Sequence, residues 1–169
     1  MLLKYLLLVT LLISPAFGAK PNIVFIFADD WGWGDLSCHG HPYVKTPNID
    51  RLAKEGTDFS RFTVVTGHFP ARYSINGHFA WVPSNAKRNM PDWLDTSAPS
   101  LPRILQKAGY ATAHYGKWHL ANNMIPDSPT PDAYGYDEYG AFNCAGEQMP
   151  VHEDADHAIN FIKKSARAD

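Results

Sequence analysis

The most constraining feature of the sequence is a continuous apolar run, Ile23 to Ala28, that ends in two adjacent aspartates, Asp29 and Asp30. The run is rich in residues that favour strands, and no polar residue interrupts it. Such continuity is typical of a strand covered on both faces, as in a parallel sheet with helices outside. Carboxylates at the carboxyl end of such a strand lie where open α/β sheets bind ligands. The run therefore predicts an α/β fold with a candidate site at the two aspartates.

Capping and periodicity signals predict three helices. The first begins at Thr46-Pro47, which suits a helix start, and stops at Gly56. The second covers about 100–108 and has an apolar stripe formed by Leu101, Ile104, Leu105 and Ala108. In the third, acidic residues precede and lysines follow a stripe formed by Ala155, Ala158, Ile159 and Ile162. Apolar stripes of this kind are typical of the buried face of a helix.

A second strand is predicted over residues 110–115, which alternate large and small side chains and lead into Gly116-Lys117-Trp118-His119-Leu120. Two stretches, about 76–99 and 121–150, are rich in proline, glycine and aromatic residues and are predicted to be irregular. The order strand, helix, helix, strand indicates α/β architecture. Because two strands make only part of such a sheet, we expect an incomplete domain.

The first nineteen residues are typical of a secretory signal. Lys4 gives a weakly positive start, the apolar run Leu6 to Ile13 follows, and Ala16 to Ala19 offers small residues to a peptidase. The alternative is an N-terminal membrane anchor. No later segment is long enough to span a bilayer. We therefore assign residues 1–19 to a signal peptide and 20–169 to one domain, and expect an exported protein without a transmembrane span after signal removal.

Charge and cysteine content exclude several classes of function. Fifteen basic and seventeen acidic residues give a formal charge of −2, so no basic excess exists to neutralise a nucleic-acid backbone. The two cysteines, Cys38 and Cys144, match no disulfide-rich scaffold and no four-ligand zinc pattern. They are expected to be bystanders, which an oxidising compartment could pair. Cys38 with His39 and His41 is a weak candidate for a soft metal.

Asp29 and Asp30 are candidate ligands for a hard cation. Calcium and magnesium prefer several oxygen ligands, and the nearby Gly32 and Gly34 let the backbone approach. The alternative is a turn in which the aspartates bond their own backbone. The dipeptide alone does not decide between these two interpretations.

Three ordered blocks of the sequence closely resemble the sulfatase family, and this resemblance favours the interpretation of Asp29 and Asp30 as cation ligands. The blocks are residues 21–36 (PNIVFIFADDWGWGDL), 46–56 (TPNIDRLAKEG) and 109–120 (GYATAHYGKWHL). The resemblance extends over nearly all of residues 20–165. It implies the α/β fold that sulfatases share with alkaline phosphatases, of which this chain resembles the N-terminal portion.

The resemblance also implies a chemistry, the hydrolysis of sulfate esters. The family's nucleophile is a formylglycine made from the first residue of C-x-P-S-R or S-x-P-S-R, and a calcium ion polarises the sulfate. Asp29 and Asp30 match the family's first two calcium ligands, which leaves the Ca²⁺ site incomplete because this ion takes about six to eight oxygens. Lys117 and His119 match residues that contact the sulfate and assist proton transfer. Their chemistry agrees, since lysine neutralises anions and histidine moves protons near neutral pH.

The nucleophile segment of the family is not found in this sequence. Val65 is followed directly by Thr66-Gly67-His68. One alignment places His68 at the nucleophile. The preferred alignment places Thr66-Gly67-His68 on the T-G-R that follows the nucleophile in the family, so that C-x-P-S-R and four further residues are missing. Neither cysteine is followed by x-Pro-Ser-Arg. The precursor of formylglycine is therefore absent, and the chain as written is expected to be inactive.

Two other functions stay open beside that of a sulfatase. One is a catalytically dead remnant or binding protein. The other is a phosphoester or phosphonate hydrolase of the same superfamily, for which Thr66 is a nucleophile candidate on position alone. The expected ligand is a sulfated small molecule or carbohydrate. Trp81, Trp93 and the tyrosines near 134–139 are candidates for stacking on a sugar, although loop aromatics more often pack against the domain.

Overall fold

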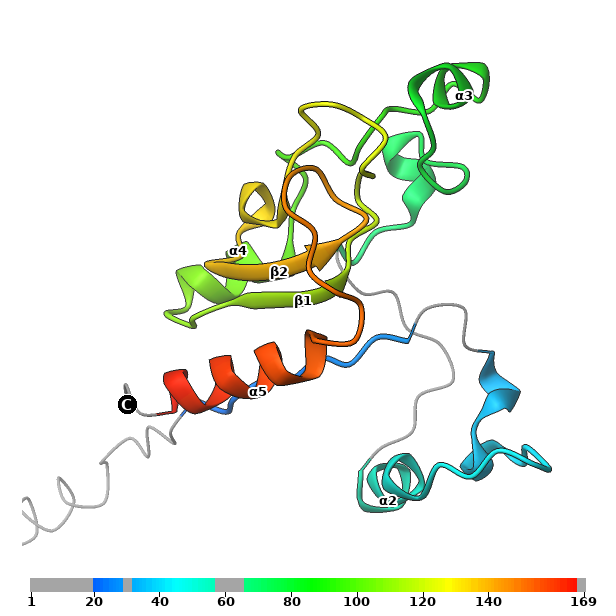
Figure 1. Ribbon diagram of the computed structural model, residues 1–169, viewed down its shortest axis with the longest axis vertical. Helices are drawn as coiled ribbons and strands as arrows, with labels where there is room; N and C mark the ends of the chain where they lie inside the picture. Colours follow the sequence, from blue (N-terminus) through cyan, green and yellow to red (C-terminus); the bar gives the residue numbers. More distant parts are fainter. Residues whose placement is uncertain (1–19, 29–31, 57–65, 167–169) are drawn as a thin grey trace, which may run out of the picture. The chain divides into compact units, whose positions relative to one another are not determined.

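The computed structural model describes residues 20–28, 32–56 and 66–166. The chain divides into two compact units, Met1–Asp58 and Phe59–Asp169, which are described separately (Figure 1). The expected signal peptide at residues 1–19 lies outside the described residues, as do Asp29 and Asp30. Along the described residues, no helix combines the length and apolar character needed to cross a membrane.

In the first unit, residues 20–28 form neither a helix nor a strand, although the sequence predicts a buried strand from Ile23. Ile26 is 85% exposed and Phe27 is 73% exposed. A buried strand needs neighbours that pair its backbone and side chains that cover both of its faces. The other described elements of this unit are short helices, namely η1 (Trp33–Asp35), η2 (Ser37–His39) and α2 (Pro47–Glu55). The prediction of a buried strand at this position is therefore wrong.

Helix α2 begins and ends where the sequence predicts, with Thr46 before it and Gly56 after it. Asp50, in its first turn, accepts hydrogen bonds from Ser37 Oγ (2.6 Å), Thr46 Oγ1 (2.9 Å) and the Cys38 N–H (3.0 Å). The bond from Ser37 is the main reason why the pKa of Asp50 lies below its ordinary value. Thr46 thus supports the helix start through Asp50, since its side chain makes no direct bond to a helix N–H.

The second unit contains a two-stranded parallel sheet, consistent with the predicted α/β fold. Strand β1 (Ala113–Lys117) pairs with β2 (Glu138–Phe142), so that Lys117 lies opposite Phe142 (Figure 1). Strand β1 begins and ends later than the predicted strand at 110–115. Strand β2 falls in a stretch that the sequence predicts to be irregular. Because both strands run in the same direction, their carboxyl ends lie at one edge of the sheet.

The helices of the second unit are α3 (Val82–Lys87), α4 (Leu101–Lys107) and α5 (Asp154–Ser165), with 3-10 turns η3 (Pro70–Tyr73) and η4 (Pro131–Tyr134). Helices α4 and α5 lie where the sequence predicts them. Helix α5 packs against the sheet, and in Figure 1 it runs alongside β1.

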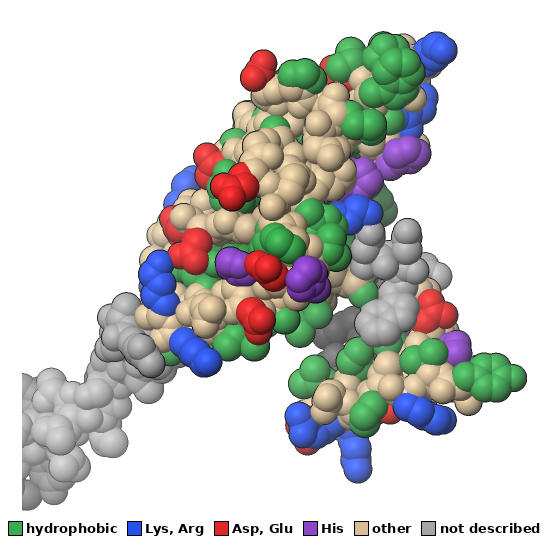
Figure 2. Space-filling model, viewed as in Figure 1, with side chains coloured by type: hydrophobic (Ala, Val, Ile, Leu, Met, Phe, Trp, Pro, Cys, Tyr) green, Lys and Arg blue, Asp and Glu red, His purple; other side chains and the backbone are tan. Residues whose placement is uncertain are grey.

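The apolar stripes of α4 and α5 are more exposed than their spacing predicts. Ile104 on α4 is 59% exposed, and Ile159 on α5 is 46% exposed. Figure 2 shows hydrophobic side chains at the surface over α5. Helix α5 instead contacts β1 through His157 and Phe161, whose ring centroids lie 5.7 Å and 6.3 Å from that of Tyr115. Spacing therefore locates these helices correctly but not the side chains that pack inward.

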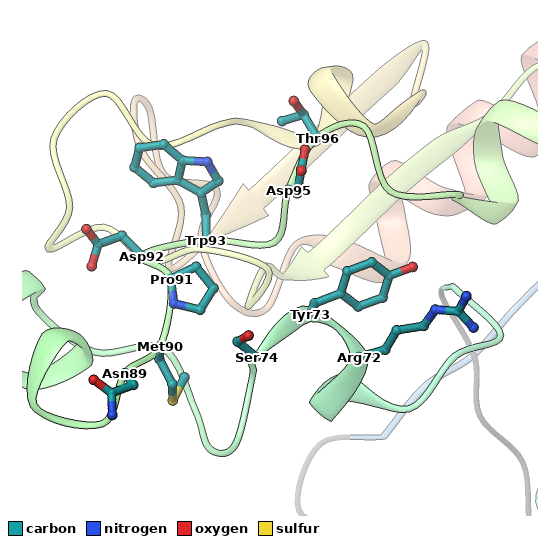
Figure 3. Close-up of a pocket in the computed structure, with 10 residues that line it drawn as sticks. All are labelled: Arg72, Tyr73, Ser74, Asn89, Met90, Pro91, Asp92, Trp93, Asp95 and Thr96. Carbon is teal, nitrogen blue, oxygen red and sulfur yellow. The ribbon is translucent and has the colours of Figure 1, made fainter.

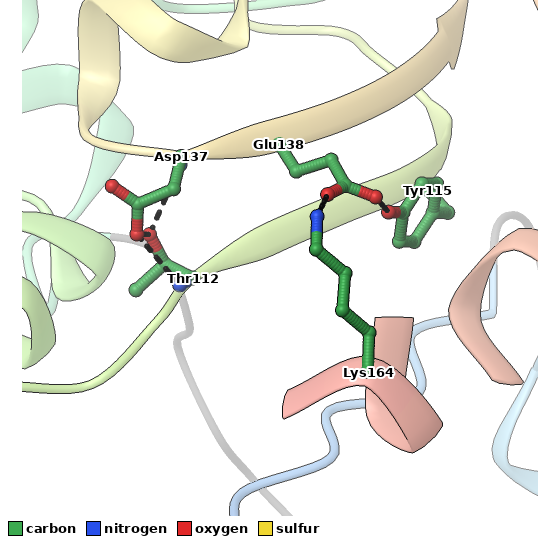
Figure 4. Close-up of polar contacts among 5 residues, drawn as sticks. All are labelled: Thr112, Tyr115, Asp137, Glu138 and Lys164. Atoms are coloured by element: carbon green, nitrogen blue, oxygen red, sulfur yellow. Dashed lines mark hydrogen bonds and ion pairs between the residues drawn. The ribbon is translucent and has the colours of Figure 1, made fainter. Parts of the chain in front are cut away.

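Side-chain hydrogen bonds tie β1, β2 and α5 together (Figure 4). Glu138 accepts bonds from the Tyr115 hydroxyl (2.5 Å) and from Lys164 Nζ (2.7 Å). The bond from Lys164 is the main reason why the pKa of Glu138 lies below its ordinary value. Asp137, just before β2, accepts bonds from the Thr112 N–H (2.8 Å) and hydroxyl (2.9 Å). Together these contacts support the register of the two strands.

Loops supply most of the core of the second unit. Its buried apolar residues are Phe79, Met90, Leu94, Ala98, Trp118, Tyr134, Ala141 and Cys144. The Tyr134 hydroxyl donates to the Leu94 carbonyl (2.6 Å), and the Ser100 hydroxyl donates to the Tyr134 carbonyl (2.6 Å). Gly135 has a φ of +99°, and a Cβ there would lie 2.9 Å from the backbone nitrogen of Arg103. Only glycine fits this turn, which holds Tyr134 in the core.

Candidate functional site

The candidate site lies at the edge where both strands of the parallel sheet end. Lys117 is the last residue of β1 and is half-buried. The pairing continues for one more residue, because the Trp118 N–H donates to the Phe142 carbonyl (2.9 Å). Asn143 then donates from Nδ2 to the Trp118 carbonyl (3.2 Å). The backbone that carries Lys117 is therefore held at the sheet edge by β2.

Trp118 and His119 have opposite environments although they are adjacent. Trp118 is 3% exposed, and its ring lies 5.2 Å, edge to face, from that of Tyr134. His119 is exposed. Successive side chains of an extended backbone point in opposite directions, so the side chains of Lys117 and His119 lie on the side away from Trp118. Lys117 and His119, the two site residues that block 109–120 predicts, thus lie two positions apart at this edge of the sheet, and their contact with a sulfate stays a prediction.

A further histidine, His78, lies beside His119. The centroids of the two imidazole rings are 6.4 Å apart, and both side chains are exposed. His78 comes from the loop before α3, a stretch that the sequence predicts to be irregular. Sequence reasoning did not single out His78, because nothing local to it signals a neighbour forty-one positions further along the chain.

The other predicted site residues are not brought to this edge within the described residues. Asp29 and Asp30 lie outside them. His68, which one alignment places at the nucleophile, forms a hydrogen bond between its Nδ1 and the Tyr73 hydroxyl (2.8 Å). Thr66 accepts a bond at Oγ1 from the His68 N–H (3.1 Å). Thr66 and His68 therefore form a local turn in front of η3.

Neither cysteine takes part in a disulfide. Cys38 is exposed and Cys144 is buried. Burial raises the pKa of the Cys144 thiol, which disfavours the reactive thiolate. In the described ranges, no group of three or more histidine, cysteine, aspartate or glutamate side chains could hold a metal ion. Cys38, His39 and His41 therefore do not form the soft metal site considered from the sequence.

A polar cavity of about 810 Å³ opens between η3 and the segment that precedes α4 (Figure 3). It is lined by residues 72–74, 89–93, 95 and 96. Trp93, one of the candidates for sugar stacking, is among them. Arg72 supplies one positive charge, whereas Asp92 and Asp95 supply two negative charges. This balance suits a neutral or weakly polar ligand better than a sulfate group.

The remaining aromatic candidates for sugar stacking differ in exposure. Trp81 is 59% exposed and Tyr139 is 39% exposed, so both have surface available. Tyr134 is fully buried in the core. Its assignment to a sugar site is therefore wrong, because its ring and its hydroxyl are both used by the fold.

Comparison with protein families gives a match over most of the chain. The model of the family described as Sulfatase matches residues 21–168. The chain belongs to the sulfatase family. The human N-acetylgalactosamine-6-sulfatase is 36% identical over 160 residues, which cover 79% of this sulfatase chain and 29% of the human protein. An N-acetylgalactosamine-6-O-sulfatase of Bacteroides thetaiotaomicron is 43% identical over 106 residues, covering 60% of this chain and 21% of the bacterial protein.

Solved structures agree with this assignment. One from work on glycosaminoglycan metabolism by Bacteroides thetaiotaomicron has a TM-score of 0.60 and 33% identity, covering 79% of this chain and 30% of that one. A crystal structure of Ps i-CgsB has a TM-score of 0.60 and 29% identity, and the match covers 85% of this chain and 33% of that one. Ps i-CgsB in complex with k-i-k-neocarrahexaose has a TM-score of 0.51. The sulfatase chain thus spans about a third or less of the length of these relatives.

His114, inside block 109–120 of the sulfatase chain, provides a test of the core behind the site. Its ring lies 5.2 Å from that of Trp118 and 5.4 Å from that of Tyr136. Burial lowers the pKa of His114 from its ordinary value of 6.5. As the pH falls below 6.5, the unfolded chain therefore binds the proton first, and stability present above that pH is lost.

We expect the free energy of unfolding to fall between pH 7.5 and pH 5, with His114 contributing up to about 1.4 kcal/mol per pH unit. Urea unfolding of the wild type and of His114→Phe across this range measures that contribution. His152→Gln, which alters an exposed histidine, is the control and should keep the wild-type slope. An unchanged slope in His114→Phe would show that His114 is not held neutral by burial.

Proposed function

We propose that this chain supplies the sulfate-contacting edge of a hydrolase that cleaves sulfate esters of carbohydrates. The observation that supports the proposal is that Lys117 ends β1 and is followed at the sheet edge by the exposed His119, in a sulfatase-family chain. Relatives named N-acetylgalactosamine-6-sulfatase support a sulfated carbohydrate as the substrate class. The similar structure solved with neocarrahexaose supports a saccharide in such a site.

The chemistry of the two side chains suits a sulfate ester. The Lys117 ammonium neutralises the negative charge of the sulfate and donates to its oxygens. When the bond between sulfur and the bridging oxygen breaks, that oxygen takes up a proton, which the exposed His119 imidazole is placed to supply. Trp118 lies between these two residues in the sequence. Its side chain is buried, so it holds the backbone of both residues against the core.

The attacking group is the part that this chain lacks. No C-x-P-S-R or S-x-P-S-R occurs in the sequence, and the His68 imidazole bonds to Tyr73. The proposal for the chain as written is therefore binding of a sulfated ligand without turnover. The same absence favours a sulfate-binding protein as the second candidate function.

The proposal includes a calcium ion that Asp29 and Asp30 would bind. Their carboxylates are the hard oxygen donors that Ca²⁺ prefers, and when bound the ion supplies positive charge that polarises the sulfate oxygens. Within the described residues no further cluster of acidic, histidine or cysteine ligands is available. The donor set assigned to calcium here is thus limited to two carboxylates.

We expect calcium binding to be weak, with a Kd of about 10⁻⁴ M or weaker, because affinity rises with the number of charged ligands. Titration calorimetry with CaCl₂ measures it. Asp29→Ala should remove the heat of binding, whereas Glu147→Ala, which alters an exposed carboxylate, should leave it unchanged. Sub-micromolar binding that depends on Asp29 would mean that the chain supplies a nearly complete calcium site.

The sulfate-binding proposal is tested by titrating the chain with N-acetylgalactosamine 6-sulfate. We expect Lys117→Ala to weaken binding on the order of tenfold to a hundredfold, because a hydrogen bond to a charged group is worth about 1.5–3 kcal/mol. His119→Ala should also weaken it. Lys107→Ala is the matched control, since it removes an exposed lysine at the end of α4. Equal affinity of wild type, Lys117→Ala and His119→Ala would contradict the proposed function.

A further inference from the structure

His78 stands in the site region without a role in the proposed chemistry. Its ring lies 6.4 Å from that of His119, with the two ring planes inclined by 48°. Among the described residues, neither imidazole forms a hydrogen bond with the protein. Both rings are exposed. Two imidazoles that are close together and unused by the fold are available to a ligand.

The loop that carries His78 is anchored immediately after this residue. Phe79, the next residue, is 4% exposed and belongs to the core cluster. Ala80 is held by the side chain of Asn85, which is fully buried. The Asn85 Oδ1 accepts from the Ala80 N–H (2.8 Å), and the Asn85 Nδ2 donates to the Ala80 carbonyl (2.7 Å). Such a two-way bond fixes the backbone just after His78.

A second buried asparagine connects this loop with the segment that follows His119. Asn122 is 1% exposed and donates from Nδ2 to the Ala80 carbonyl (3.1 Å). Leu120, between His119 and Asn122, accepts at its carbonyl from the Leu94 N–H (2.8 Å). The backbones that carry the two histidines are therefore bonded to one another through buried polar groups. Because such groups are costly to leave unpaired, the backbone segments that carry the two rings are held close to one another.

The number of side chains that can donate hydrogen bonds here matches the number of terminal oxygens of a sulfate ester. A sulfate ester has three terminal oxygens, each of which accepts hydrogen bonds. Lys117 and His119 approach from β1 and the residues after it, whereas His78 approaches from a separate loop. An imidazole always carries at least one N–H, so His78 can donate in either protonation state.

We propose that His78 is a third sulfate-contacting residue of the site, donating an N–H to a terminal oxygen of the group that Lys117 and His119 bind. This inference rests on the proposed function, because it assumes that those two residues hold a sulfate. Asn85 and Asn122 are positioning residues, since they act on the ligand only through the loop that carries His78.

The test compares the affinities of five variants of the full chain for inorganic sulfate, N-acetylgalactosamine 6-sulfate and unsulfated N-acetylgalactosamine. We expect His78→Ala to weaken binding of both sulfated ligands about tenfold, as for loss of a charge-assisted hydrogen bond. His78→Gln keeps an N–H donor and should retain most of the affinity. Lys117→Ala and His119→Ala should weaken binding as well, and Lys107→Ala, at an exposed lysine at the end of α4, should not. Far-ultraviolet circular dichroism checks that each variant keeps the wild-type fold.

The outcomes separate this inference from the proposed function. If His119→Ala and Lys117→Ala weaken sulfate binding but His78→Ala does not, the role of His78 is overturned and the proposed function stands. If His78→Ala affects only the sulfated sugar and not inorganic sulfate, His78 contacts the sugar, and the sulfate contact is overturned. If the wild type binds neither sulfated ligand, both proposals fail.

Discussion

The chain as written should not hydrolyse an aryl sulfate or N-acetylgalactosamine 6-sulfate above background. Restoring C-S-P-S-R and four helix-forming residues after Val65 should create activity. The restored segment supplies the formylglycine precursor, its activating arginine and a helix start suited to an anion. Loss of a covalent nucleophile typically lowers turnover by on the order of 10⁴-fold or more. In the proposed function Lys117 and His119 orient the ester and supply charge and a proton, but neither of them is proposed to attack sulfur.

The experiment uses two proteins that differ only in this insertion. Each joins residues 20–169 to the part of the Bacteroides thetaiotaomicron N-acetylgalactosamine-6-O-sulfatase that follows the matched region, because the chain covers 21% of that relative. Both are expressed with the enzyme that converts cysteine to formylglycine. A third protein carries the insertion with alanine in place of its cysteine and should be inactive. Turnover by the protein without the insertion that disappears on His68→Ala would overturn the prediction, because it would make His68 the nucleophile.

Helices α2, α4 and α5 were predictable because their signals are local, whereas α3 (Val82–Lys87) falls in a stretch that the sequence predicts to be irregular. Thr46-Pro47 and Gly56 lie at the ends of α2, and the glycine at 109 follows α4. The acidic start and the lysines at the end of α5 also appear where the dipole argument places them. Each of these signals depends on residues within one or two turns of the helix that it delimits.

The strands were less predictable because a strand depends on partners far away in the sequence. Strand β2 contains Glu138 and Gly140, which weaken a strand pattern, and is stabilised by pairing with β1. The apolar run at Ile23 to Ala28 has the opposite problem, since its residues favour a strand but no described residue of its unit pairs with it. Sequence patterns also misjudge which helix faces are buried, as Ile104 and Ile159 show.

The residues of the candidate site likewise differ in whether local sequence signals predict them. Lys117 and His119 were found because they belong to one short block that resembles a family motif. The proximity of His78 to His119 depends on the bonds from Asn85 and Asn122 to Ala80. Those bonds join three separate segments, and no local sequence pattern in any of the three predicts the bonds. The contact between His78 and His119 could therefore not be predicted from the sequence and was found only in the folded structure.

Replacement of Trp118 by alanine should lower the free energy of unfolding by about 3–5 kcal/mol, the usual cost of removing a large aromatic side chain from a core. The ring is 3% exposed and packs against Tyr134, His114 and Tyr136. Its Nε1 has no hydrogen-bond partner in the part of the chain that the structure describes, so the loss comes from packing alone. Trp118→Phe keeps most of that packing and removes the unpaired N–H. Its cost should therefore be clearly smaller than that of Trp118→Ala, because the phenyl ring leaves a smaller cavity.

His119→Ala, one position further along, is the matched control. His119 is exposed and should change stability by less than about 0.5 kcal/mol, as is usual for surface positions. Urea unfolding followed by circular dichroism measures stability in all three variants, and titration with N-acetylgalactosamine 6-sulfate measures binding in those that stay folded. Trp118→Phe should keep its affinity while His119→Ala loses it. Equal stability of Trp118→Ala and His119→Ala would mean that the G-K-W-H block is not anchored through its tryptophan. The alternation that places Lys117 and His119 on one side of the sheet edge would then lose its structural basis.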